Sequence, residues 1–197
     1  MNKFFKYKSL KSYLNYIRDN YPIMTFSEWK SQNGILLRHD VDFDIESAFK
    51  MALVEITCGV RSTYFITMSA YMYNPLAEEN RNILRKMAHF NFEMGLHFDP
   101  TIYSEKDLEN AIVMEASALE FVIGKKVTSI SLHDSGDCKK YPFFDNYINA
   151  HDNSIFSSES YLSDSNMDFK GKDPYEFVKA AANKTIQVSL HPCYYTK

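Results

Sequence analysis

Short apolar runs alternate along the chain with longer stretches in which apolar residues recur every three or four positions. The short runs are typical of buried strands, and the longer periodic stretches are typical of helices packed on one side. Strands are predicted at 35–40, 62–68, 92–97, 127–133, 154–157 and 185–191, and helices at 45–57, 75–89, 105–123, 140–149 and 173–183. Ahead of them, apolar residues at helical spacing predict an opening helix: Leu10, Tyr13, Leu14 and Ile17. This alternation predicts repeated βαβ units and a mainly parallel sheet.

Four of the predicted strands are apolar on one face and polar on the other. Because alternate strand residues point to opposite sides, Ile130 and Leu132 oppose Ser131 and His133. A sheet covered by helices on both faces is apolar on both, so the polar face must meet something else. A doubly wound sheet fits the order of elements, but the strand faces favour an α/β barrel whose polar residues line a lumen.

The length and charge of the chain narrow its class. We expect all 197 residues to form one domain, 1–197, with residues 1–30 as an N-terminal helical extension. The net charge of −3 argues against nucleic acid as a partner, and no apolar run reaches the ~20 residues of a transmembrane segment. The basic N-terminus lacks the apolar core of a signal peptide, so a cytoplasmic location is expected.

The last polar residues of the four strands are acids and imidazoles that would meet at the mouth of the barrel: Asp40, Asp42, His97, His133 and His191. Burying such groups together is costly unless they are paired or bind a cation. Asp and His ligands suit Zn²⁺ or a similar first-row ion such as Co, Ni or Fe, and a catalytic site usually has three protein ligands. Such an ion lowers the pKa of a bound water to about 7 and polarises a carbonyl. The sequence therefore predicts a divalent metal cofactor.

Five ordered segments resemble the motifs of polysaccharide deacetylases, the chitin- and peptidoglycan-deacetylase-like carbohydrate esterases. The segments are Arg-His-Asp-Val-Asp at 38–42, Ser-Thr-Tyr-Phe-Ile at 62–66, Gly-Leu-His at 95–97, Leu-Ser-Asp-Ser around Asp164 and Leu-His-Pro at 190–192. The resemblance runs from about residue 35 to the end and implies a distorted, incomplete (β/α)7 barrel of mainly parallel strands. The chain looks closest to the subgroup associated with O-antigen and capsule synthesis.

The resemblance implies a role for each matching residue. Asp40 becomes the general base, Asp42 and His97 become metal ligands, and His191 becomes the general acid. Asp164 matches the acidic motif that supports this histidine, with Phe169 as its aromatic companion.

One position departs from the family pattern. The family's second ligand motif is His-x-x-x-His, but Thr101 stands four residues after His97. The third ligand must come from elsewhere or be water. His133 is the candidate, because it ends a neighbouring strand on the polar face, where the family usually has an Arg-Pro segment.

Each candidate site residue could instead have a purely structural role. Asp40 and Asp42 could cap the helix at 45–57, and His97 and His191 could simply occupy a core or a strand end. His133 with residues 134–136 reads well as a turn.

The sequence also gives an expected role or environment for several other polar and aromatic residues. Arg38 is expected to pair with Asp40 and orient it, and is counted with Tyr194 and Tyr195 in the substrate-binding set. His39 lies on the apolar face and is expected to be structural. Exposure to solvent is expected for His89 and His151, and Cys193 is expected to be a buried thiol.

The predicted function is a metal-dependent hydrolase that removes an acetyl group from an N-acetylated sugar, or nucleotide sugar, of a surface-polysaccharide precursor. The alternatives are a catalytically degenerate sugar-binding or assembly protein of the same kind of pathway, and a hydrolase of another small amide. Six residues follow His191, so the barrel is expected to be open or completed by a second chain. The second case predicts a homodimer.

Overall fold

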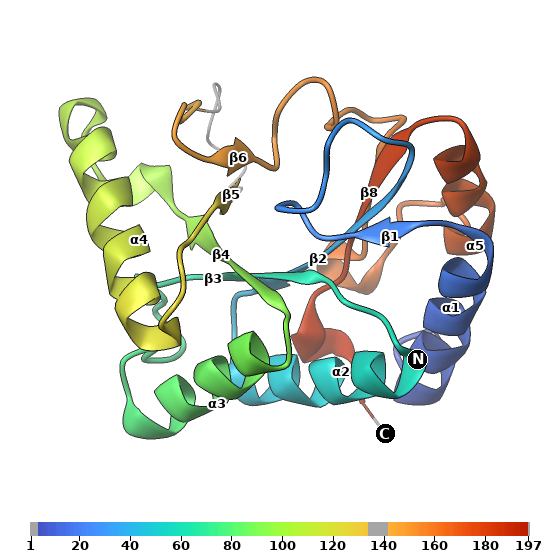
Figure 1. Ribbon diagram of the computed structural model, residues 1–197, viewed down its shortest axis with the longest axis horizontal. Coiled ribbons are helices and arrows are strands. Elements are labelled where there is room, and N and C mark those ends of the chain that lie inside the picture. The colour runs from blue at the N-terminus through green and yellow to red at the C-terminus, as the bar shows by residue number, and fades with distance from the viewer. Residues whose placement is uncertain (1–3, 134–141, 197) are drawn as a thin grey trace.

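Eight parallel strands form one curved sheet in the computed structural model, which describes residues 4–133 and 142–196 (Figure 1). Seven strands follow the order β6-β5-β4-β3-β2-β8-β7, and β1 pairs with the beginning of β2. The strands are β1 Ile23–Met24, β2 Gly34–Val41, β3 Thr63–Ile66, β4 Glu93–Phe98, β5 Ser129–Leu132, β6 Ile148–Asn149, β7 Tyr161–Ser163 and β8 Thr185–Ser189. The predicted incomplete (β/α)7 barrel is confirmed.

The barrel is open between β6 and β7, which are the two edges of the sheet within the described residues. The chain between these strands spans the gap, and a side chain of β8 holds it. Nε2 of Gln187 donates to the carbonyl oxygens of Ala150 and Ile155, at 2.7 and 3.0 Å. Side-chain hydrogen bonds thus replace a strand ladder on this side.

The helices surround the outside of the sheet, in contact from α1 through α2 and α3 to α4, while α5 lies beside α1 (Figure 1). They are α1 Tyr7–Asn20, α2 Ile45–Cys58, α3 Glu78–His89, α4 Leu108–Ile123 and the short α5 Pro174–Phe177. Short 3₁₀ helices occur at Pro100–Ile102, Glu105–Asp107, Ser165–Met167, Val178–Ala182 and Pro192–Tyr194. The predicted opening helix is confirmed as α1, and its four apolar residues are buried. None of the described helices is long and apolar enough to cross a bilayer.

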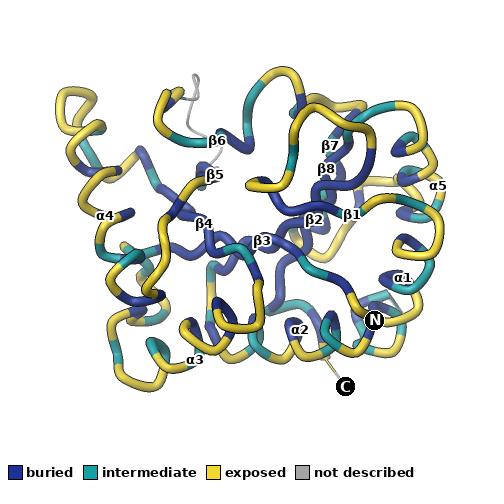
Figure 2. Tube along the Cα trace, in the orientation of Figure 1, coloured by how far each residue is buried: buried dark blue, intermediate teal, exposed yellow. Residues whose placement is uncertain are grey.

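Apolar residues pack on both sides of the sheet. Figure 2 shows the central strands mainly in dark blue, the colour of buried residues. Two clusters lie between the strands and the helices, and a third lies inside the curve around Phe26, Leu36 and Phe65. Gly95 makes room for this inner cluster, because a Cβ there would lie 2.5 Å from the Phe65 ring. These apolar residues plug the lumen below the polar mouth, and the Glu93 carboxylate accepts hydrogen bonds from Thr63 and Ser129 at the amino ends of the strands.

His39 faces the helices, where it joins three elements. Its Nε2 lies 2.9 Å from Oε1 of Glu55 in α2, and its Nδ1 lies 3.0 Å from the carbonyl oxygen of Leu190. The hydroxyls of Ser62 and Tyr64 donate to the second Glu55 oxygen. The prediction that His39 is structural is confirmed.

Two predicted elements are wrong. Residues 154–157 form turns rather than a strand, because Oδ1 of Asp152 accepts from the backbone N–H and the hydroxyl of Ser154. The helix expected at 140–149 is replaced, in its described part, by a loop ending in β6. The side chain of Asn149 bonds to both backbone groups of Phe144 and fixes this loop. Residues 140 and 141 lie outside the described part.

Candidate metal centre

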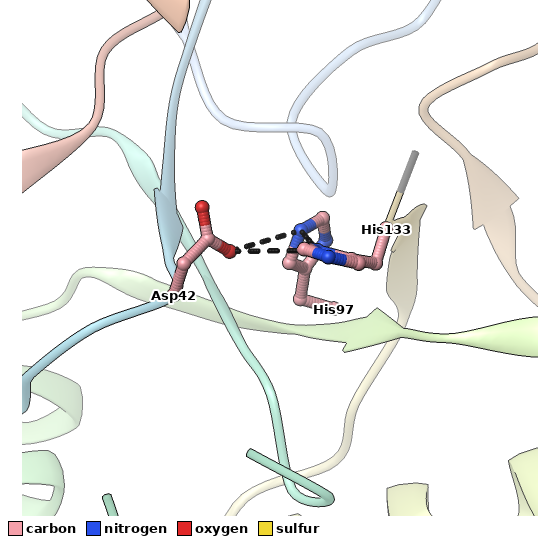
Figure 3. Close-up of side chains that lie close together, drawn as sticks. All are labelled: Asp42, His97 and His133. Carbon is pink, nitrogen blue, oxygen red and sulfur yellow. Dashed lines mark hydrogen bonds and ion pairs between the residues drawn. The ribbon is translucent and has the colours of Figure 1, made fainter. Parts of the chain in front are cut away.

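Asp42, His97 and His133 point toward one another at the carboxyl ends of β2, β4 and β5 (Figure 3). Nε2 of His97 lies 3.3 Å from Oδ1 of Asp42, and Nδ1 of His133 lies 3.7 Å from the same oxygen. The two ring nitrogens are 3.3 Å apart. One ligand atom from each residue lies within 4.8 Å of the others, so the three side chains form a candidate metal site.

The donor atoms fit a small divalent cation. Two ligands at 2.0–2.1 Å from a tetrahedral zinc ion would lie about 3.4 Å apart, close to the separation of the two ring nitrogens. Oδ1 of Asp42 is buried and has no hydrogen-bond partner, so it faces the imidazoles without bonding to them. Nδ1 of His97 faces the carbonyl oxygen of Ser131 at 3.3 Å, which leaves Nε2 free as a ligand. Burial raises the pKa of Asp42, but the imidazoles of His133 and His97 outweigh it and hold that pKa well below its usual range.

Thr101 is not part of this cluster. Its backbone N–H and its hydroxyl both donate to Oδ1 of Asp99, at 2.9 and 2.6 Å, and begin the 3₁₀ turn Pro100–Ile102. The geometry groups His133 with Asp42 and His97 instead. The reading of His133 as the start of a turn concerns residues 134–136, which lie outside the described part.

Asp40 lies beside the cluster in a buried ion pair with Arg38. Nη2 of Arg38 is 2.8 Å from both carboxylate oxygens of Asp40, and Ser189 donates to Oδ2 at 3.2 Å. The Arg38 guanidinium also contacts the Ser131 hydroxyl and lies over the Phe65 ring. Burial raises the pKa of Asp40, but Arg38 outweighs it and holds the pKa well below its usual range, so the carboxylate is charged. The predicted ion pair is therefore present.

Neither Asp40 nor Asp42 caps the following helix. Asp44 does so, because its Oδ1 accepts from the backbone N–H of Ser47 at 2.6 Å. The helix-cap reading of the first two acids does not hold.

His191 is held by a buried acid, as the resemblance implies. Oδ1 of Asp164 lies 2.6 Å from Nδ1 of His191, and Tyr195 donates to Oδ2 of Asp164 at 3.2 Å. The other ring nitrogen, Nε2, lies 3.7 Å from Oδ2 of Asp42. Burial lowers the pKa of His191, but the hydrogen bond and charge of Asp164 outweigh it and raise the pKa to about 9. His191 is therefore protonated at neutral pH.

These residues line one cavity of about 370 Å³. Three walls were expected from the sequence: Arg38 with Asp40 and Asp42, His97 with His133, and His191. The fourth wall comes from the segment between β6 and β8 and includes His151, Phe156, Tyr161, Ser163, Ser165, Asn166 and Lys170.

His151 was expected in solvent, and that expectation is wrong. Its Nδ1 accepts from the backbone N–H of Leu132 at 3.3 Å, and its ring lies 4.5 Å from that of Phe156. Burial lowers the pKa of His151 to about 3, so its ring is neutral. His151 follows the two-residue strand β6, which is too short to show an alternating pattern.

The two tyrosines assigned to substrate lie in different surroundings. Tyr195 is buried, with its hydroxyl on Asp164, so a direct contact with substrate does not fit its position. Tyr194 is half-buried, with its ring 5.5 Å from that of His191 and its hydroxyl accepting from the backbone N–H of Asn166. Phe169 packs on Phe5 in the outer core. Cys193 is half-buried rather than buried, and burial raises its pKa to about 12.

No family model matches the chain. No curated protein matches it either. Several solved structures have a similar fold. The CE4 domain of a multidomain xylanase from the hindgut metagenome of Trinervitermes trinervoides aligns at a TM-score of 0.56 and 15% identity, over 82% of this chain and 74% of that one. The chitin deacetylase of the fungal pathogen Colletotrichum lindemuthianum aligns at 0.54 and 16% identity, over 83% and 75%.

A family 4 carbohydrate esterase from Bacillus anthracis aligns at a TM-score of 0.53 and 15% identity, over 93% of this chain and 77% of that one. A CE4 family pseudoenzyme from the same organism aligns at 0.50, over 82% and 55%. At sequence identities this low, these structural alignments show a shared fold and nothing more. The structural neighbours thus include CE4 family deacetylases and a pseudoenzyme.

Proposed function

We propose that this protein is a metal-dependent carbohydrate N-deacetylase. One observation supports this most strongly: a charged carboxylate, Asp40, and a protonated imidazole, His191, line the same cavity as the candidate metal ligands. Amide hydrolysis needs a base for water and an acid for the leaving amine, and these two groups have the required protonation states at neutral pH.

Each group of cavity residues has its own role in the proposed amide hydrolysis. Asp42, His97 and His133 would hold the cation, which when bound would supply Lewis acidity toward water and the amide carbonyl. Asp40 accepts the proton of the attacking water, and Arg38 and Ser189 fix its orientation. His191 gives its Nε2 proton to the departing amine, while Asp164 keeps Nδ1 protonated. The products are acetate and a free amino sugar.

The proposed substrate is an N-acetylated sugar, or nucleotide sugar, of a surface-polysaccharide precursor, and the proposed metal is zinc. A cavity of about 370 Å³ is of the size that small ligands occupy. The rings of Phe156 and Tyr161, 4.7 Å apart, offer an apolar surface for a sugar face. The motif resemblance supports the pathway, and a cytoplasmic site of action is proposed with it.

The test is release of acetate from N-acetylated sugars and nucleotide sugars by purified protein supplied with Zn²⁺ or Co²⁺. Activity above that of an Asp40→Asn variant supports the proposal. Equal rates for both proteins with every sugar would contradict it.

A second candidate is a non-catalytic sugar-binding or assembly protein. Two observations favour it: Thr101 replaces a family ligand, and one structural neighbour is a CE4 family pseudoenzyme. Metal analysis of protein purified without chelator separates the candidates, because a degenerate site would hold well under one equivalent. A hydrolase of another small amide is distinguished by substrate profiling.

A further inference from the structure

A second cavity is lined by four large apolar side chains that are exposed to solvent. Phe43, Tyr71, Met72 and Ile102 are 46, 99, 60 and 54% exposed. They line a groove of about 330 Å³, which we name the acyl groove; the rest of its lining is Ala70 and the polar residues Asp42, Thr67, Ser69, Asp99 and His133. Large apolar side chains gathered around one hollow mark a surface that binds an apolar group.

The acyl groove meets the catalytic cavity at the candidate metal centre. Asp42 and His133 line both spaces. Asp40 and His191 line only the first cavity. A substrate carbonyl at the metal centre would therefore border both the cavity with the acid and base and the groove with the apolar residues.

The two ends of an amide have different requirements, and these determine how a substrate would lie across the two spaces. The amide nitrogen must face His191, which protonates it, so the sugar lies in the polar cavity. The acyl substituent projects from the opposite side of the carbonyl carbon, toward the groove. Building on the proposed function, we infer that the substrate's acyl group lies in the acyl groove, which accepts acyl chains longer than acetyl.

The size and chemistry of the groove support an acyl chain over a second sugar ring. A methyl group is comparable in size to a water molecule, which occupies about 30 Å³, so acetyl would fill little of a groove of about 330 Å³. A sugar ring needs several fixed polar partners for its hydroxyls, whereas Phe43, Met72 and Ile102 offer none. Of the polar lining residues, Asp99 already accepts two hydrogen bonds from Thr101 through its Oδ1. A short alkyl chain gains from burial against these side chains.

The reaction balances as ordinary amide hydrolysis. The oxygen of water bonds to the acyl carbon and the carbon–nitrogen bond breaks. One water proton passes to Asp40, and the amine takes a proton from His191. An alkyl carboxylate and an ammonium sugar leave.

The experiment compares N-acetyl-, N-propanoyl-, N-butanoyl- and N-hexanoyl-glucosamine with the zinc-loaded protein. We expect kcat/KM to rise by about threefold for each added methylene, slightly below the gain for full burial of that group. Saturation-transfer NMR should show the acyl protons in contact with the protein, a readout independent of turnover.

The variants Met72→Gln and Ile102→Gln should remove the rise of kcat/KM with chain length. Met114→Gln is the matched control, because Met114 is 58% exposed on α4, away from both cavities. Equal melting temperatures would show that all three variants are folded.

The outcomes separate this inference from the proposed function. Cleavage of acetyl with falling rates for longer chains would overturn the inference alone. Saturation of acyl protons without cleavage of any sugar would support the acyl groove and contradict the deacetylase. A preference for an N-acetylated disaccharide that is lost in Met72→Gln would assign the groove to a second sugar ring and overturn the inference.

Discussion

Oδ1 of Asp164 accepts hydrogen bonds from both the ring Nδ1 and the backbone N–H of His191, at 2.6 and 3.0 Å. One buried carboxylate thus fixes the position of the histidine and keeps a proton on its Nδ1, and its charge raises the pKa of the ring. Burial raises the pKa of Asp164, while the hydrogen bonds that it accepts favour its charged form.

Replacing Asp164 with Asn keeps the shape of this contact and removes its charge. The pKa of His191 should then fall from about 9 toward about 6.5, the value of an unperturbed histidine. A general acid must be protonated, so the alkaline limit of kcat should move to lower pH, and kcat at pH 8 should fall by about 30-fold as the protonated fraction falls. Tyr195→Phe keeps the charge and should retain most of the activity. A pH–rate profile with the same alkaline limit in Asp164→Asn would contradict this role.

Removing a candidate ligand should empty the metal site. Protein loaded with Zn²⁺ and then desalted is expected to hold about one equivalent, and His133→Ala or Asp42→Asn well under half of that, since each loses one of three ligands. Thr101→Val is the control, because the Thr101 hydroxyl is bonded to Asp99 and not to the cluster. Elemental analysis provides the measurement. A full equivalent in His133→Ala would exclude this histidine from the site.

The Arg38–Asp40 pair should matter for stability as well as for orientation. Arg38→Met leaves a buried carboxylate without its cation and should lower the free energy of unfolding by about 3–5 kcal/mol at pH 7. Urea titrations of the chelated protein measure this loss. A decrease below about 1 kcal/mol would show that Asp40 finds another partner.

The same pair gives a dependence on pH whose sign is fixed. The folded pKa of Asp40 is lowered, so its charge contributes stability above the unfolded value of about 3.9. That contribution is lost as the pH falls below this value. Wild-type protein should therefore lose more stability than Arg38→Met between pH 6 and pH 3, in parallel urea titrations.

Gly95→Ala tests the packing inside the barrel. Its Cβ would lie 2.5 Å from the Phe65 ring and 2.8 Å from the Ser129 hydroxyl, so the unfolding free energy should fall by about 1–3 kcal/mol. Phe65→Leu in the same chain should recover part of the loss, because it frees space beside the new methyl group. Additive losses in the double variant would show that the ring is not the obstacle.

The sequence predicted the part of the fold that rests on long strands. β2 and β4 have eight and six residues, enough to show which positions face the lumen, and the site residues at their ends came together as expected. β6 and β7 have two and three residues, too few for a pattern, so the wall with His151 and Tyr161 was missed. The inner apolar cluster around Phe26, Leu36 and Phe65 was also missed, because Leu36 is a single apolar residue on the otherwise polar face of its strand.

The third candidate ligand could be predicted only from the position of its strand. The motif spacing pointed to residue 101, whereas His133 approaches from a different strand, and only the pairing of β4 with β5 brings it beside His97. Spacing along one segment cannot report such a neighbour. The order of the strands in the sheet, together with the face on which each residue lies, can indicate it.

The break between β6 and β7 has a mechanical consequence. A closed hydrogen-bonded ladder would fix the circumference of the barrel, so that no strand could move outward without losing backbone bonds. Here the wall carrying His151 and Phe156 is fastened through the amide of Gln187. That wall can therefore move outward at the expense of these two side-chain contacts and of the hydrogen bond between His151 and Leu132, while the strands that bear the candidate metal ligands keep their register.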